Sequence, residues 1–245
     1  MTGRNNSSDR YYDFSDNDLI TNGNGLDAAN WWREHDEFSN AGDWEENELT
    51  TDESDAVDWW TNEGYHDAKA LYETPITGME PHLYDAISDL TNAINKFELK
   101  KGMTVHRATS FLIFGAESKG QKLSVDEVKN FIKTNTDKGL MQIDGFMSFT
   151  TRPNGVAVAA RGAVIDLDVP PNKGMGAYVS GVGGNYTERE YLTNRNAILR
   201  FDANSVRQDD HGLIHVKARL MGRAERQTID PQNTSKFKKK KSTNS

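Results

Sequence analysis

The stretch from residue 174 to residue 201 constrains the fold of this chain more than any other. A short apolar strand is expected at 177–179, a glycine-rich loop follows at 181–184, and a second strand is expected at about 187–192. The chain is therefore expected to place a strand on each side of a flexible loop.

The second of these strands carries two acidic residues, Glu188 and Glu190. Successive side chains of a strand point to opposite faces, so both carboxylates are predicted on one face and Arg189 on the other. Like charges held close together raise the proton affinity of the pair and do not favour stability, so we interpret them as a site for a developing cation. The alternative is a solvated strand face, since a second Glu-x-Glu occurs at Glu46 and Glu48 in an acidic segment.

Composition limits the class of protein. The 245 residues can form one large domain or a domain with an extension, and a hydrophobic fraction of 36% indicates that part of the chain does not contribute to a core. The absence of cysteine excludes disulfides, thiolate metal ligands and a cysteine nucleophile. With no signal-peptide pattern and no run of eighteen apolar residues, we expect a soluble cytoplasmic protein without membrane contact.

Charge is unevenly distributed along the chain. Residues 1–64 contain seventeen Asp and Glu against three Arg, a net charge of −14, which leaves +6 for residues 65–245 out of the total of −8. We expect an acidic, partly disordered extension at 1–50, a folded domain at 51–225 and a basic disordered tail at 226–245. The alternative to simple disorder is that the lysine run at 236–241 contacts nucleic acid.

Hydrophobic periodicity and capping patterns predict a mixed helix-and-strand chain. Three helices are expected at 26–38, from 52 towards 71, and at 80–97, and a fourth begins at the capping box of Ser124. Strands are expected at 103–109, 111–114, 145–150, 156–169, 197–201 and 213–220. His211 and His215 are four apart, a spacing on a strand that is too long for a shared metal, so no metal site is predicted.

Two of the predicted strands carry polar residues that could serve a site. Arg107 shares a strand face with apolar residues, which indicates an anionic partner unless it reaches solvent at the strand end. Ser148 and Thr150 lie on one face of the strand at 145–150, where their hydroxyls could hold the rotamer of a neighbouring carboxylate; hydroxyls on an open strand face are the ordinary alternative.

Paired tryptophans stand out in the acidic first quarter, at 31–32 and 59–60. Tryptophan is enriched at interface hot spots, which suggests a partner-binding segment. Packing on the protein's own domain is the favoured interpretation, because tryptophans of amphipathic helices usually pack there.

Taken in order, the strand with Val-His-Arg107, the strand with Ser148-Phe-Thr150 and the strand with Glu188-Arg-Glu190 resemble the arginine, serine-x-serine, glutamate class of mono-ADP-ribosyltransferases. This class includes the enzymatic components of clostridial binary toxins and transferases of some bacteriophages. The resemblance covers roughly residues 80–220 and leaves residues 1–60 and the lysine tail outside. It departs from many members in having Phe149 between the two hydroxyl residues and Tyr191 directly after the last glutamate.

The resemblance implies an α+β ADP-ribosyltransferase fold, with two packed antiparallel sheets around an NAD cleft and flanking helices. It implies that the protein transfers ADP-ribose from NAD, its substrate, to exposed arginines of a target protein. It also implies that the reaction needs no metal and that the enzyme is a monomer. The roles that it implies are stabilisation of the cation by Glu190, orientation of that carboxylate by Ser148, and alignment of the acceptor by Glu188. The implied NAD contacts are Arg107, Ser148, Thr150, Arg152 and Glu190, and the implied target contacts are Glu188 and Tyr186.

The sequence is compatible with four hypotheses for the function of the site. The leading one is an arginine-specific transferase, acting in the host cytoplasm if a phage encodes it. The others are an NAD glycohydrolase, a transferase with nucleic acid as acceptor, and a non-catalytic module that binds a partner. Phe149 and Tyr178 are candidates for contact with nicotinamide, with packing in the core as the alternative.

Overall fold

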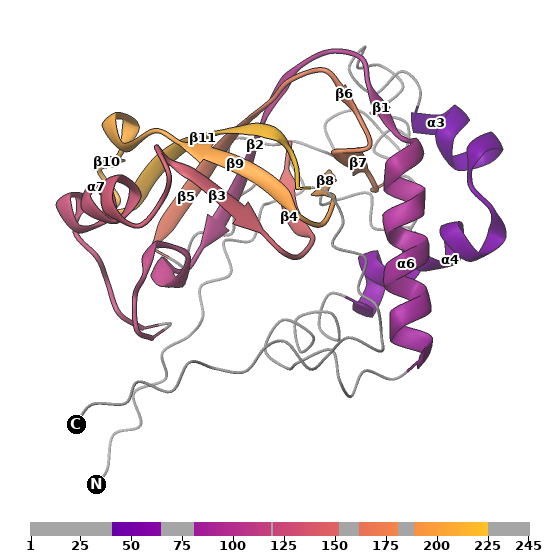
Figure 1. Cartoon of the computed structure of the whole chain (residues 1–245), viewed down its shortest axis with the longest axis horizontal. Helices are drawn as coiled ribbons and strands as arrows, with labels where there is room; N and C mark the ends of the chain where they lie inside the picture. Colours follow the sequence, from indigo (N-terminus) through magenta and orange to yellow (C-terminus); the bar gives the residue numbers. More distant parts are fainter. Residues whose placement is uncertain (1–40, 65–80, 119, 152–161, 181–188, 225–245) are drawn as a thin grey trace, which may run out of the picture.

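The computed structural model describes residues 41–64, 81–118, 120–151, 162–180 and 189–224. The expected α+β fold is confirmed, with helices gathered beside a mixed main sheet (Figure 1). The main-sheet strands are β2 (Met103–Thr109), β3 (Leu140–Ile143), β4 (Met147–Thr150), β5 (Ala163–Val169), β7 (Gly176–Tyr178), β8 (Glu190–Thr193), β9 (Ala197–Phe201), β10 (Arg207–Gln208) and β11 (Ile214–Arg223).

The order of strands in this sheet is β3-β9-β11-β5-β2-β4-β8-β7, with β10 paired to β11. A single register pair, His106 with Thr150, joins β2 to β4, so the two sheets that the resemblance implies are continuous at this point. The pairing is antiparallel throughout this order except between β5 and β11, which are parallel. Two further short strands, β1 (Glu98–Leu99) and β6 (Asn172–Lys173), pair separately.

The helices lie at two places around the sheet. Figure 1 shows α6 (Pro81–Lys96) beside α4 (Thr51–Trp59) near β7 and β8, and α7 (Val125–Thr134) on the far side near β10. Both α4 and α7 begin with the capping box, in which a Thr50 or Ser124 hydroxyl accepts from the N3 amide and the N3 glutamate accepts from the cap amide. None of the described helices is long and apolar enough to cross a membrane.

Within the described residues, the acidic N-terminal segment contributes to the core. The short helix α3 (Ala41–Asp43) leads into a π-helical turn η3 (Trp44–Glu48), and Trp44 is fully buried against α6. Its Nε1 donates to the Ala93 carbonyl oxygen at 2.9 Å, and its ring meets Phe97 edge-on. Residues 41–50, which the sequence placed in the extension, are thus packed on the domain.

The sequence prediction of a strand at 111–114 is wrong, because these residues form the 3-10 helix η5 (Phe111–Phe114). Side chains three apart share a side of such a helix, so Phe111 and Phe114 are both buried while Leu112 is exposed. Gly115 closes the helix in the left-handed region, with φ of 86°, which a glycine adopts without steric cost. Of the helix predicted at 52–71, the structure describes α4 and the π-helical turn η4 (Trp60–Gly64); the helix predicted at 26–38 lies outside the described residues.

Candidate active site

The three sequence motifs come together because β2, β4 and β8 are neighbours in the sheet. Thr150 lies directly opposite Glu190 in the β4–β8 pair and opposite His106 in the β2–β4 pair. Ser148 lies two residues from Thr150 on the same face, opposite Leu192. The register therefore gathers residues 40 or more positions apart where the ends of β4 and β8 meet the middle of β2.

Glu190 is the first residue of β8 and is only 6% exposed. Its backbone is fixed on the β7 side by two hydrogen bonds: its amide donates to Ser180 Oγ at 2.6 Å, and its carbonyl accepts from the Val179 amide at 3.0 Å. A buried carboxylate with a fixed backbone is an electrostatically strong group, because the low dielectric around it screens its charge less than water does. Such a group is suited to stabilising a nearby positive charge.

The structure corrects the predicted start of this strand. The strand begins at Glu190, and Arg189 has a φ of 47°, in the left-handed region rather than in the extended one. The regular alternation of side chains between the two strand faces, on which the prediction of a shared face for Glu188 and Glu190 depends, is therefore interrupted at Arg189. Glu188, Tyr186 and Arg152 lie outside the described residues, and their predicted roles stay predictions.

Arg107 lies at the β2–β4 junction. Its Nη1 donates to the backbone carbonyl oxygen of Ser148 at 2.6 Å, and the contact is partly buried. The guanidinium thus joins the two strands that are linked by only one register pair, instead of reaching into solvent at the strand end. A guanidinium presents five donor hydrogens in a planar fork, a geometry that matches the oxygens of a phosphate.

Trp60 supplies a contact that sequence reasoning did not find. Its indole Nε1 donates to Glu190 Oε1 at 3.2 Å, and the Trp60 side chain is 4% exposed. The sequence had marked the tryptophan pair 59–60 and favoured packing on the protein's own domain, which is confirmed for Trp60. No local pattern could have indicated which residue, 130 positions away, its N–H would meet. Trp31 and Trp32 lie outside the described residues.

Residues 29–223 match the ADP-ribosyltransferase exoenzyme family. The chain belongs to this family. The family match begins well before residue 60, so the expectation that residues 1–60 lie outside the resemblance is wrong from residue 29 on. The buried Trp44 and Trp60 give the physical reason, because the N-terminal helices complete the core and reach Glu190.

Solved structures of two ADP-ribosylating toxins and of a C3 exoenzyme share the fold of this family member. Plx2a, an ADP-ribosyltransferase toxin from Paenibacillus larvae, is 25% identical with a TM-score of 0.63, over 80% of this chain and 96% of Plx2a. BECa, from a binary enterotoxin of C. perfringens and solved with NADH, is 20% identical with a TM-score of 0.61, over 80% of this chain and 48% of BECa. The C3 exoenzyme of Clostridium limosum is 14% identical with a TM-score of 0.61, over 82% of this chain and 96% of the exoenzyme.

These comparisons confirm the fold and the family. This exoenzyme-family chain spans about half the length of BECa and nearly the full length of Plx2a. No curated protein sequence matches it.

Phe149 and Tyr178, the candidates for contact with nicotinamide, lie on the other face of the sheet from Glu190. Each is paired in register with Tyr191, and all three rings are buried in the hydrophobic core. Cross-strand partners share a face and neighbouring residues alternate, so these rings point away from the side that Glu190 occupies. The structure favours packing in the core for both residues.

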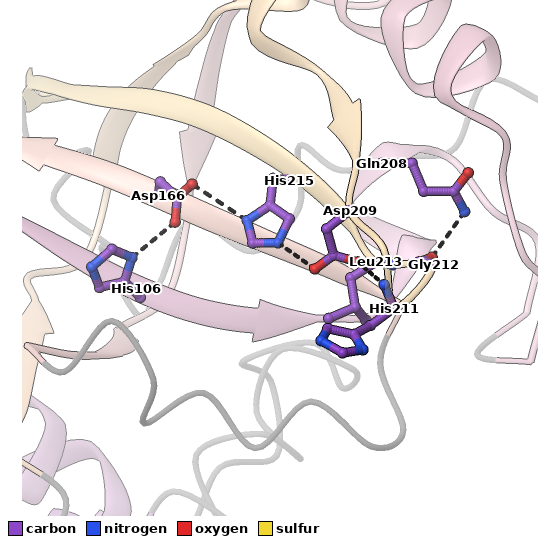
Figure 2. A network of polar contacts seen from close by, with 8 residues as sticks. All are labelled: His106, Asp166, Gln208, Asp209, His211, Gly212, Leu213 and His215. Atoms are coloured by element: carbon purple, nitrogen blue, oxygen red, sulfur yellow. Dashed lines mark hydrogen bonds and ion pairs between the residues drawn. The ribbon is translucent and has the colours of Figure 1, made fainter.

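A second polar network crosses the sheet beside the site (Figure 2). His106 Nδ1 lies 2.8 Å from Asp166 Oδ1, His215 Nδ1 lies 3.5 Å from Asp166 Oδ2, and His215 Nε2 lies 3.0 Å from Asp209 Oδ2. His211, predicted on the same strand as His215, instead lies in the turn before β11, where its amide donates to Asp209. Within the described part of the chain, no group of three or more His, Cys, Asp and Glu could hold a metal ion.

This network predicts a defined pH dependence of stability. Burial alone would raise the pKa of the Asp166 carboxyl, but the hydrogen bond from His106 and the positive charges of His106 and His215 lower that pKa below its usual value. A carboxyl with a lowered folded-state pKa stabilises the protein at pH values above its unfolded-state pKa, which is near 3.9. This contribution is lost as the pH falls through the folded-state pKa. We expect the melting temperature of Asp166→Asn to fall less between pH 5 and pH 3 than that of the parent.

Circular-dichroism melts of both proteins at pH 7, 5, 4 and 3 test this expectation. The parent is expected to be the more stable protein at pH 7, with the difference shrinking as the pH is lowered. Equal losses in parent and variant would show that Asp166 does not contribute to the acid sensitivity.

Proposed function

We propose that this protein transfers ADP-ribose from NAD to arginine side chains of a target protein and releases nicotinamide. The observation that carries the proposal is the adjacency of β2, β4 and β8, which brings Ser148, Thr150 and the buried Glu190 to one face of the sheet and anchors Arg107 to the Ser148 backbone at the β2–β4 junction. Membership of the exoenzyme family supports the use of NAD, and the NADH in the BECa structure is consistent with it.

The first chemical step breaks the bond between ribose C1′ and the nicotinamide nitrogen. Nicotinamide leaves with the bonding electron pair as a neutral molecule, and the ribose develops oxocarbenium character, as in glycoside hydrolysis. A carboxylate near C1′ stabilises that charge, and its preorganisation in a buried site makes the effect larger than in water. Glu190 takes this role in our proposal, and Arg107 binds the diphosphate or a ribose through its planar donor fork.

The second step joins the acceptor to the sugar. A guanidinium nitrogen of the target arginine attacks C1′ with its electron pair, and the surplus proton passes to solvent or to a nearby carboxylate. The Glu188 carboxylate pairs with the guanidinium and presents one nitrogen to C1′; full deprotonation before attack is excluded by the very high pKa of arginine. Arginine as the acceptor rests on the resemblance to the transferase class in which a glutamate at the position of Glu188 accompanies arginine acceptors.

A transfer assay tests the proposed function. The purified full chain is incubated with labelled NAD, either with a cell lysate or with agmatine as a small guanidine acceptor, and both label transfer and nicotinamide release are followed. We expect labelled protein and labelled agmatine, and removal of the protein label by hydroxylamine.

Other outcomes identify the alternatives. Nicotinamide release without transfer would indicate a glycohydrolase, and label on nucleic acid would indicate a different acceptor. No turnover of NAD by a folded protein would contradict the proposed function.

A further inference from the structure

The hydrogen bond between Trp60 and Glu190 joins the N-terminal helical segment to the candidate catalytic carboxylate. Both side chains are at least nine-tenths buried, and Trp60 Nε1 lies 3.2 Å from Glu190 Oε1. We propose that Trp60 is a positioning residue, which holds the Glu190 carboxylate in the orientation needed to cleave NAD. This inference rests on the proposed function, because it gives Glu190 the role described above.

The indole is held firmly by its surroundings. Its ring meets Phe146 edge-on, with centroids 5.2 Å apart, and Phe146 directly precedes β4, the strand of Ser148 and Thr150. Edge-to-face aromatic pairs prefer this geometry. The same side chain therefore contacts the residue that leads into β4 through its ring and β8 through its N–H.

The helix that directly precedes Trp60, α4, is itself anchored on α6. Glu53 accepts from the Thr50 amide at the start of α4 and forms an ion pair with Lys96 near the end of α6. Burial would raise the pKa of Glu53, but the bonds from Lys96 and Thr50 lower it, so this carboxylate stays ionised at neutral pH. The anchor limits the motion of α4 and hence the position of the indole.

The chemistry of the indole suits this role. Its N–H is a donor only, so it bonds the ionised carboxylate in a fixed direction. It carries no charge, so it orients Glu190 and leaves intact the negative charge that stabilises the cation. A lysine or arginine at this position would partly neutralise that charge. A carboxylate offers about four acceptor positions, so the bond from Trp60 is compatible with another from a ribose hydroxyl of NAD.

Substitution of Trp60 by Phe tests the proposal. Phenylalanine keeps an aromatic ring against Phe146 and removes the N–H. We expect kcat for nicotinamide release to fall about 10- to 100-fold, the usual effect of losing one hydrogen bond to a charged group, with KM for NAD changed less than threefold. Release without acceptor and transfer to agmatine are expected to fall together, because both require the same bond cleavage.

Trp44→Phe provides the matched control. It removes another fully buried indole N–H from the same segment, but that N–H donates to the Ala93 backbone carbonyl oxygen and not to Glu190. A purely structural role of these tryptophans predicts parallel effects: both variants would lose thermal stability, and kcat per folded molecule would stay at the parent value in both. We expect that pattern for Trp44→Phe only.

A spectroscopic readout tests the contact independently of activity. The indole N–H resonance of Trp60, assigned by its absence from Trp60→Phe, is expected to shift in Glu190→Ala, while the Trp44 resonance keeps its position. An unchanged Trp60 resonance, or a normal kcat of Trp60→Phe beside an active parent, would overturn this inference and leave the proposed function intact. No NAD turnover by the parent would overturn both.

Discussion

Replacing Glu190 by Gln is expected to lower nicotinamide release about 1000-fold or more, both with and without an acceptor. The substitution keeps the size and the hydrogen-bonding oxygen of the side chain but removes its negative charge. Since that charge stabilises the oxocarbenium-like transition state, its loss raises the barrier by roughly 4 kcal/mol, at 1.36 kcal/mol for each tenfold change in rate. Initial rates at saturating NAD measure the effect.

The fold is expected to tolerate this change. A glutamine carbonyl oxygen can accept from Trp60 Nε1 as the carboxylate does, and the Ser180 and Val179 bonds involve only the backbone of residue 190. The melting temperature should therefore stay within a few degrees of the parent value. A variant that melts normally and retains near-normal turnover would show that the cation is stabilised by another group.

Replacing Glu188 by Gln is expected to separate the two activities. Transfer to agmatine should fall about 100-fold, whereas nicotinamide release without acceptor should change by less than about fivefold. The reason is that an amide cannot form the charge-assisted, two-pronged pair with a guanidinium, while NAD cleavage depends on Glu190. Parallel assays of label transfer and nicotinamide release on the same preparation measure the ratio.

The neighbouring acidic residue serves as the internal comparison. Glu190→Gln is expected to lower both activities, so a selective loss in Glu188→Gln would not be a general effect of removing charge from this segment. Equal losses of both activities would place Glu188 in the cleavage step, and unchanged transfer would show that another residue aligns the acceptor.

Local patterns in the sequence determined several elements of this protein. The apolar stripe of α6, the alternation along β2 and β9 and the Ser124 capping box each depend on residues a few positions apart, and all four elements occur where they were predicted. The three motifs also indicated the family, because they combine residue types and order along the chain. Arg107, Ser148 and Glu190 could therefore be selected as candidates before their positions in space were known.

Tertiary structure decided what these residues contact. The run 111–114 has strand-like composition, yet the burial of Phe111 and Phe114 together with the turn at Gly115 makes it helical. The left-handed conformation of Arg189 moved the start of β8 to Glu190.

Trp60 illustrates the limit of the sequence most clearly. A tryptophan pair in an acidic helix indicates burial, but the partner of its N–H lies 130 residues away on another element. Periodicity and capping are set by neighbours within a few residues, and so the sequence determined the elements and the candidate chemistry. The orientation of the Glu190 carboxylate depends on α4, α6, β4 and β8 packing together, so only the folded chain could decide it.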